Sequence, residues 1–325
     1  MLMEQTEHFD VPKHEYRQYS QEEIDEARGN LSLMNDRVFM VAFEKNKNNH
    51  IITGLVNALR RIHDVTPIPQ IQSTTVQEPS LADILGRGMV ADLTGLGLQI
   101  NIALEAQRKI QEGYAVRATL SSSNVMRHQF ETGSDYTEAP DVIGVNILGF
   151  KLPELENSPM FCSRIVRAEY DTKETFLADK YSDYFVELPK MSVWTKANSP
   201  EQYHELLDYC SIIQAKIKDH ERVVQMQAIT NPTVLELAEE AQKAVAPSDF
   251  VNATLNRKSE MEQLSDYIRM QQRKAAEEAA EKTAEEMILA ALRSNFATTV
   301  IETMQKSAGI TEARLDELKQ QAQMA

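Results

Sequence analysis

Residues 86–107, GRGMVADLTGLGLQINIALEAQ, constrain the fold more than any other stretch of this chain. Two apolar runs flank the turn Gly95-Leu96-Gly97, which is the pattern of a β-hairpin. Asp92 lies near the end of the first run, Glu105 near the end of the second, and Gln107 two residues further on. Residues two apart on a strand share a face, so Glu105 and Gln107 point the same way and Asp92 can face them. Two carboxylates and an amide at a hairpin edge suit a hard divalent cation such as Mg²⁺.

Size and charge set the outer limits. A chain of 325 residues exceeds the usual single domain, so we expect a core domain with an appendage. The formal net charge of −15 argues against a general electrostatic grip on nucleic acid but allows a local basic patch. Cys162 and Cys210 form no metal spacing and no disulfide framework, which fits a reducing cytoplasm. We find neither a signal pattern nor an apolar run near the ~20 residues of a membrane span. We therefore expect a cytoplasmic protein with no membrane partner.

The pattern along the chain predicts an α+β fold in three ranges. Residues 1–30 are polar and acidic and predict an N-terminal arm. Residues 31–220 mix helix-periodic segments with apolar strand patterns and predict the core. Residues 221–325 predict a helical region, much of it rich in alanine and glutamate. Its apolar stripe is thin, so both self-association and packing back on the core remain open.

Two acids outside the hairpin have competing interpretations. Asp36, next to Asn35, can begin a helix as part of its cap, or it can reach the metal site. Capping is the favoured role. Glu187 interrupts an apolar run, so a metal-site role has to be considered. The favoured interpretation is a strand-end acid that pairs with Lys190 or Arg164.

The segment after the hairpin is the most basic part of this acidic chain. It contains Arg108, Lys109, Arg117 and Arg127, and its apolar spacing predicts a helix over Arg108–Asn124. Arginines brought beside a metal site by such a helix would position a phosphodiester. Ordinary solvent-exposed arginines explain the pattern equally well, and both interpretations stay open.

The ordered set of motifs resembles a known family. The motifs are, in order, NDRVFMVAF, GLVNALRRI, VADLTGLGLQINIALEAQ, GYAVRATLSSS, APDVIGVNILGF and FVELPK. Their order looks like that of the PD-(D/E)XK nuclease-family transposases, also called recombination-promoting nucleases. The C-terminal AAEEAAEKTAEEMILAALRSNFATTVIETMQKSAGITEARLDELK is similar to their charged helix and closing helix, so the resemblance covers about residues 31–320.

This resemblance implies a restriction-endonuclease-like core, in which helices flank a small mixed β-sheet. By position it implies that Asp92 and Glu105 hold the metal and that Gln107 completes a Glu-x-Gln site. Asp36 matches the acid near the start of the family domain. Arg117 matches the arginine of the helix that follows the hairpin.

The implied activity is that of a metal-dependent DNA endonuclease, using Mg²⁺, Mn²⁺ or Ca²⁺, in recombination, mobile elements or defence against foreign DNA. A carboxylate-held metal would activate water and offset phosphate charge, whereas Gln107 can orient groups but cannot act as a base. One alternative is a nuclease fold that binds DNA or assembles proteins without cleavage. Another is an unrelated α+β protein whose hairpin acids are structural. We expect DNA as a partner and a homo-oligomer through the C-terminal helices.

Overall fold

The computed structural model describes residues 16–44, 48–76, 93–97, 100–127, 139–177, 180–294 and 296–323. The chain forms two compact units. The core unit is Arg17–Leu255, and the C-terminal unit comprises Met1–Tyr16 and Asn256–Ala325. Within the described part of the chain, we find no helix that is both long and apolar enough to cross a membrane. The division of the chain into the ranges 1–30, 31–220 and 221–325, which the sequence predicts, remains a prediction.

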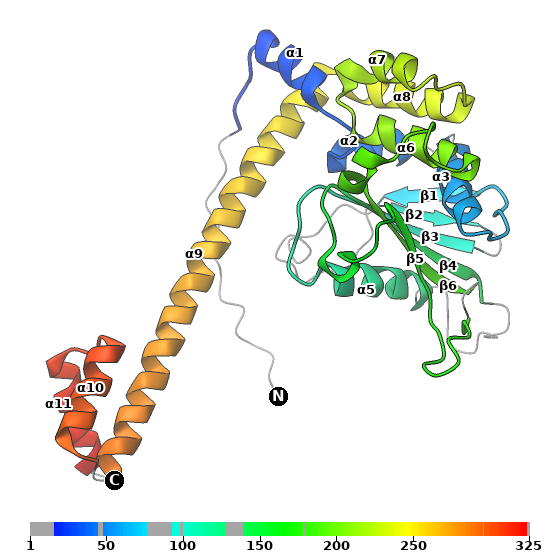
Figure 1. Cartoon of the computed structure of the whole chain (residues 1–325). Coiled ribbons are helices and arrows are strands. Elements are labelled where there is room, and N and C mark those ends of the chain that lie inside the picture. The colour runs from blue at the N-terminus through cyan, green and yellow to red at the C-terminus, as the bar shows by residue number, and fades with distance from the viewer. Residues whose placement is uncertain are drawn as a thin grey trace. The chain divides into compact units, whose positions relative to one another are not determined.

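A six-stranded mixed sheet forms the centre of the core unit (Figure 1). The strand order is β1-β2-β3-β4-β6-β5. Strands β1, β2 and β3 pair antiparallel, β3, β4 and β6 pair parallel, and β5 pairs antiparallel with β6. The strands are β1 (Ser73–Val76), β2 (Leu93–Leu96), β3 (Ile100–Gln107), β4 (Asp141–Leu148), β5 (Cys162–Ile165) and β6 (Tyr181–Glu187).

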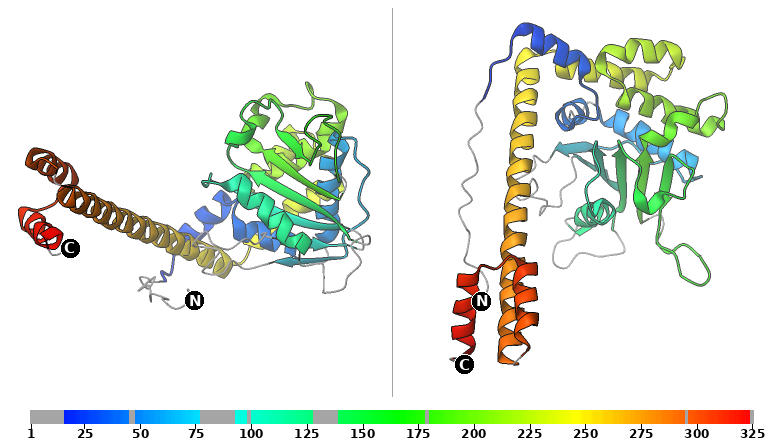
Figure 2. Two further views of the ribbon diagram at one scale, coloured as in Figure 1. Left: turned by 90° about the horizontal axis from the view of Figure 1, so that it is seen from below. Right: turned by 60° about the vertical axis from the view of Figure 1, so that its left-hand side comes forward.

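Helices cover both faces of this sheet, as the predicted α+β class requires (Figures 1 and 2). Helix α5 packs on one face against β3 and β4, and α2 packs on the other face against β1, β2 and β3. The helices of the core unit are α1 (Gln21–Asn30), α2 (Asp36–Glu44), α3 (Asn49–Ile62), α5 (Tyr114–Arg127), α6 (His204–Gln214), α7 (His220–Met226) and α8 (Pro232–Val245). Short 3₁₀ turns lie at η3 (Pro153–Leu155), η4 (Leu188–Val193), η5 (Glu201–Tyr203) and η6 (Ile217–Asp219).

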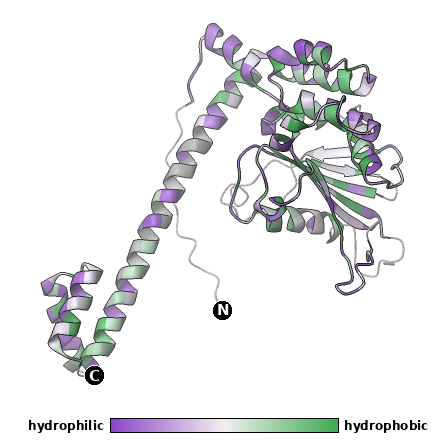
Figure 3. Ribbon diagram, viewed as in Figure 1, coloured by the Kyte–Doolittle hydropathy of each residue, from purple (hydrophilic) through white to green (hydrophobic). Residues whose placement is uncertain are grey.

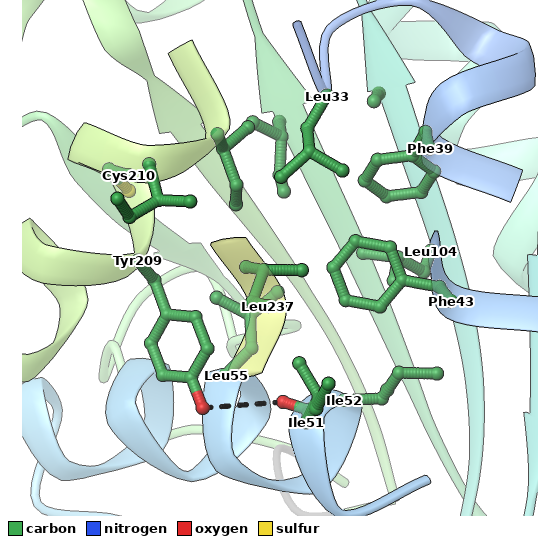
Figure 4. Close-up of a cluster of buried hydrophobic side chains, with 14 of the residues drawn as sticks. Leu33, Phe39, Phe43, Ile51, Ile52, Leu55, Leu104, Tyr209, Cys210 and Leu237 are labelled. Atoms are coloured by element: carbon green, nitrogen blue, oxygen red, sulfur yellow. Dashed lines mark hydrogen bonds between the residues drawn. The ribbon is translucent and has the colours of Figure 1, made fainter. Parts of the chain in front are cut away.

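The main hydrophobic core lies between the sheet and the helices on the face opposite α5 (Figure 4). Phe39 and Phe43 of α2 contact each other with ring centroids 4.7 Å apart, and both are fully buried with Leu104 of β3. Tyr209 of α6 donates its hydroxyl to the backbone oxygen of Ile51 on α3 (3.4 Å). In Figure 3 the central strands carry much of the hydrophobic colouring, in keeping with strands covered on both faces.

The structure confirms the predicted hairpin but moves its turn. Gly95 and Leu96 belong to β2, where they pair with Ile102 and Asn101 of β3. The turn begins at Gly97, whose N–H donates to the backbone oxygen of Ile100 (2.8 Å). Placing Gly95 and Leu96 in the turn was therefore wrong. A Cβ at Gly95 would lie 3.4 Å from Ile71, an ordinary van der Waals distance, so this position inside β2 does not require glycine for space.

The helix predicted over Arg108–Asn124 begins later, at Tyr114, and ends at Arg127. Gly113 directly precedes it with φ +71°, a left-handed conformation that a right-handed helix cannot contain. Arg108 and Lys109 consequently lie on the loop between β3 and α5, and the prediction of a helix there was wrong. Arg117 and Arg127 do lie on the helix.

The C-terminal unit contains the end of α9 (Ser248–Arg293), α10 (Thr298–Ala308) and α11 (Glu312–Gln323). These helices bury a small apolar cluster of Ile288, Ala291, Ile301, Ile310, Leu315 and Leu318. Gly309 ends α10 in the left-handed conformation (φ +69°), as the sequence predicts for a helix stop. Arg314 of α11 binds both carboxylate oxygens of Glu285 on α9, at 2.6 and 2.8 Å.

Candidate active site

The face of the sheet beneath α5 carries a row of buried polar side chains. The register aligns Glu105 of β3 with Asn146 of β4, so these two side chains point to the same face. It also aligns Ala103, Gly144 and Asp183 across β3, β4 and β6. Glu105 and Asp183 are each 3 % exposed and Asn146 is 2 % exposed. Because buried carboxylates are costly, two of them on one face indicate a functional site.

Glu105 is held under α5 with one oxygen left over. The Tyr114 hydroxyl lies between the Glu105 Oε2 atom (3.4 Å) and the Asn146 Oδ1 atom (3.2 Å) and can donate to either. The buried Oε1 atom of Glu105 has no hydrogen-bond partner among the described residues. Burial raises the pKa of the Glu105 carboxyl, while the Arg117 guanidinium and the hydroxyls of Ser121 and Tyr114 act in the opposite direction. A cation bound at Oε1 would relieve this desolvation.

Asp183 of β6 is a site residue that the sequence interpretation missed. The Ser122 hydroxyl of α5 donates to the Asp183 Oδ1 atom at 2.6 Å. Burial raises the pKa of Asp183, although hydrogen bonds from Ser122 and Tyr181 oppose that rise. The negative charge of Asp183 in turn adds to the raised pKa of Glu105. The available signal was an acid between Tyr181 and Phe185 in an otherwise buried strand.

Gly144 makes room for the pair formed by Asp183 and Ser122. A methyl group at this position would lie 1.9 Å from the Asp183 Oδ1 atom and 2.3 Å from the Ser122 Oγ atom. The missing side chain of Gly144 therefore allows α5 and β6 to bring their polar groups together over β4.

The other two predicted catalytic residues are Gln107, two residues after Glu105, and Asp92, on the preceding segment of the hairpin. Gln107 shares the face of Glu105 and is half-buried, and its Nε2 atom donates to the backbone oxygen of Lys109 (3.0 Å). With the Nε2 atom bound to Lys109, the amide oxygen is the other polar atom of the Gln107 side chain. Asp92 lies outside the described residues. Leu93, which follows Asp92 in the sequence, pairs with Leu104, the residue before Glu105.

Asp36 and Glu187 have different surroundings from Glu105. Asn35 accepts a hydrogen bond from the backbone N–H of Val38 (3.3 Å) and so caps α2, while Asp36 is the exposed first residue of that helix. Helix α2 packs on the face opposite α5, so the structure does not place Asp36 on the face of Glu105. Glu187 is fully buried and forms an ion pair with Lys190 (2.5 Å), as the favoured interpretation predicted.

The four predicted basic residues are spread over the loop and α5. Arg117 is close enough for its charge to lower the pKa of Glu105, and its Nη1 atom donates to Gln111 (2.8 Å). Arg127 is exposed at the end of α5, about 15 Å further along the helix at 1.5 Å per residue. Arg108 and Lys109 are exposed on the preceding loop. The structure therefore brings Arg117 to Glu105 and leaves the other three at the surface.

The donor set suits a hard cation. Oxygen ligands from carboxylates and amides are what Mg²⁺ and Ca²⁺ prefer, and the unpartnered Oε1 atom of Glu105 supplies one. Among the side chains that the structure describes, no group of three or more His, Cys, Asp or Glu residues is arranged to hold a metal ion. Asp92, which directly precedes β2 in the sequence, lies outside the residues searched.

The fold and this site define a class before any comparison. In the core unit an antiparallel hairpin, β2–β3, is followed by helix α5 and then by β4, which pairs parallel to β3. This arrangement, with a buried glutamate near the end of β3, is typical of a PD-(D/E)XK nuclease. Residues 33–270 match the PD-(D/E)XK nuclease family transposases, and this chain belongs to that family. Comparison with curated proteins gave no match. Comparison with solved structures gave none either. Membership in the family supports a nuclease-type function, DNA as the substrate, and a divalent metal ion as the usual cofactor.

Proposed function

We propose that this protein is a metal-dependent endonuclease that hydrolyses phosphodiester bonds of DNA. The observation that carries the proposal is Glu105, a buried carboxylate near the end of β3 with one oxygen that has no hydrogen-bond partner among the described residues. Few structural roles explain such a group, because an unpartnered buried carboxylate destabilises a fold. A nuclease of this family requires a carboxylate at this point of the hairpin.

Asp92 and Glu105 would hold the cation, with Mg²⁺ as the expected ion and Mn²⁺ or Ca²⁺ as the alternatives. When bound, such an ion supplies an activated water and offsets the charge of the phosphate. Gln107 would orient the water or the phosphate through its amide, since an amide cannot take up a proton at neutral pH. The positive charge of Arg117 would stabilise negative charge that develops on the phosphate.

Arg108, Lys109 and Arg127 would contact the DNA backbone on either side of the site. All three are exposed, and they precede or end the helix that covers Glu105. Arginine and lysine contacts to phosphates position a duplex without reading its sequence. This arrangement supports cleavage with little sequence preference, in recombination, in mobile elements or in defence against foreign DNA.

The protein would act in the cytoplasm as a homo-oligomer assembled through its C-terminal helices. Helix α9 is 46 residues long, and isolated long helices rich in alanine gain stability from a partner helix. Two protomers would also allow two cuts, one on each DNA strand.

A second candidate function is DNA binding or protein assembly with weak cleavage or none. Two observations favour it: Gln107 provides no base, and α5 leaves Glu105 only 3 % exposed. In this case Glu105 would still influence metal binding, but phosphodiester hydrolysis would be too slow to matter.

Cleavage of supercoiled plasmid tests these proposals. Wild type, Glu105→Gln and the control Glu156→Gln would be incubated with Mg²⁺, Mn²⁺ or Ca²⁺. Glu156 is an exposed glutamate after η3, so its variant removes the same charge away from the site. Metal-dependent nicking that is lost in Glu105→Gln and kept in Glu156→Gln supports the nuclease. Equal background in all three proteins, at high protein concentration and with every metal, favours the binding or assembly role.

A further inference from the structure

A pocket of about 400 Å³ opens at the carboxyl ends of the parallel strands. Arg108 follows β3, Gly149 follows β4 and Leu188 follows β6, and all three line it. Asn35, just before α2, and Lys216, just after α6, line the opposite side. The pocket therefore lies one residue beyond Gln107, the last residue of β3.

The charge of this pocket is opposite to that of the chain. Its lining includes two cations, Arg108 and Lys216, and no carboxylate, although the whole chain has a net charge of −15. Lys218 adds a third cation, because the ammonium groups of Lys216 and Lys218 both donate to the Oδ1 atom of Asn30, at 3.2 and 2.9 Å. Two like charges on one neutral oxygen repel each other unless an anion lies nearby.

These cations have no acidic partner in the part of the chain that the structure describes. None of the side chains of Arg108, Lys216 and Lys218 has a carboxylate oxygen of a described residue within 4.0 Å. By contrast, Lys180, Lys190 and Lys196 of the same unit each pair with an Asp or Glu. Arg108 and Lys216 in the pocket lining, and Lys218 beside it, are thus available to an external anion.

Neutral hydrogen-bonding groups complete the lining. The lining also includes Asn30, Ser32, Asn35 and Gln214. Ser32 accepts a hydrogen bond from the N–H of Met34 (3.3 Å), which leaves its own hydroxyl proton to donate. Hydroxyl and amide donors combined with lysine and arginine are the groups that bind phosphate oxygens in nucleic-acid complexes.

We propose that this pocket binds a backbone phosphate of the nucleic-acid strand that is cleaved at Glu105, a few nucleotides from the cleaved bond. This inference rests on the proposed nuclease function and adds a subsite to it. Arg108 lies three residue steps after Glu105, which is about 10 Å at 3.3 Å per residue of extended chain. Glu105 and the pocket both lie toward the carboxyl end of β3, so a strand cleaved at Glu105 would reach the pocket within a few nucleotides.

Salt dependence of DNA binding tests the subsite without relying on cleavage. Binding of the full chain to a fluorescent duplex would be measured by anisotropy in EDTA, over a range of KCl concentrations. Each lysine that contacts a phosphate contributes about 1 to the slope of log K against log[salt], so Lys216→Gln/Lys218→Gln should lower the slope by about 2. Lys216→Arg/Lys218→Arg keeps both charges and should retain the wild-type slope.

A matched control removes two positive charges elsewhere on the same unit. Lys173 lies on the loop between β5 and β6, and Lys180 lies just before β6; both are exposed. Lys173→Gln/Lys180→Gln should leave the slope at the wild-type value. Equal slopes for the pocket variant and the control variant would overturn the subsite, even if plasmid nicking still depends on Glu105.

A free nucleotide is the other source of the same chemistry. Isothermal titration of the full chain with inorganic phosphate and with adenosine monophosphate distinguishes the two sources. Heat from either ligand that is lost in Lys216→Gln/Lys218→Gln, together with no duplex binding by wild type, would replace the strand with a free nucleotide as occupant. No binding of duplex or of either small ligand by wild type would overturn the proposed function itself.

Discussion

Glu105→Gln should make the protein more stable without metal and less stable than wild type with metal. The wild-type carboxylate is 3 % exposed, and its Oε1 atom has no partner among the described residues. Leaving such a group unsatisfied costs about 1–3 kcal/mol. Glutamine has the same shape without the charge, so in EDTA at pH 7.5 we expect Glu105→Gln to gain up to that amount.

Bound metal should make wild type more stable than Glu105→Gln, the reverse of the order expected in EDTA. A ligand at 100 times its Kd stabilises the folded state by about 2.7 kcal/mol. Wild type should gain this on addition of Mg²⁺ or Mn²⁺, whereas Glu105→Gln should gain little because a ligand oxygen has been lost. Domains of 150–250 residues shift by about 2–4 °C per kcal/mol, so the reversal is measurable by thermal denaturation followed by circular dichroism.

Glu187→Gln is the control for this experiment, because Glu187 is equally buried and its charge is paired. It forms an ion pair with Lys190 at 2.5 Å and accepts the backbone N–H of Leu152 at 2.8 Å. Breaking a buried pair costs about 3–5 kcal/mol, and this loss should be the same with and without metal. The reasoning about Glu105 is refuted if Glu105→Gln is destabilised in EDTA as Glu187→Gln is, or if metal raises the Tm of wild type and Glu105→Gln equally.

Three further substitutions test the surroundings of Glu105. The pKa of Asp183 in the folded state is raised above its usual 3.8, so its contribution to stability is complete below that pH and is lost as pH rises through the folded pKa. In urea unfolding from pH 4 to 8, Asp183→Asn should therefore gain stability relative to wild type as pH rises. A difference in stability that stays constant over this range would contradict this. Gly144→Ala places a methyl group 1.9 Å from Asp183 and should cost about 1–3 kcal/mol in the same assay. Gln107→Lys adds a charge at a half-buried position and should speed single-turnover nicking at least about tenfold, a result that an inactive scaffold would not give.

The strands of the site could be predicted from the sequence because each carries its own local pattern. Alternation around Glu105 identifies β3 and the face that it shares with Gln107, and the apolar run from Val142 identifies β4. The pairing of Glu187 with Lys190 was also predictable, since the two residues lie three apart. Local patterns indicated what individual segments become, whereas the mixed sheet and its flanking helices were predicted from the family resemblance and are confirmed.

Asp183 could not be recognised in the same way. Its partner Ser122 lies 61 residues earlier in the chain, and the two meet because α5 crosses the sheet from β3 to β4 while β6 pairs on the far side of β4. No spacing in the sequence reports that meeting. The turn at Gly95 was predicted wrongly for a related reason, since the sequence does not show whether a glycine lies in a turn or inside a paired strand.

The sequence also does not show which charged residues lie close together in the fold, and this arrangement explains how an acidic chain can bind DNA. A net charge of −15 describes the sum, but a phosphate responds to charges within about one Debye length, which is about 8 Å at physiological ionic strength. Lys216 and Lys218 are more than 100 residues from Arg108 in sequence, yet Arg108 and Lys216 line one pocket. Acidic residues beyond the Debye length weaken the approach of DNA without cancelling this local field. The acidity of the chain then limits non-specific binding, and productive contact requires that a strand reach the carboxyl ends of β3 and β4, where Arg108, Lys216 and Glu105 lie.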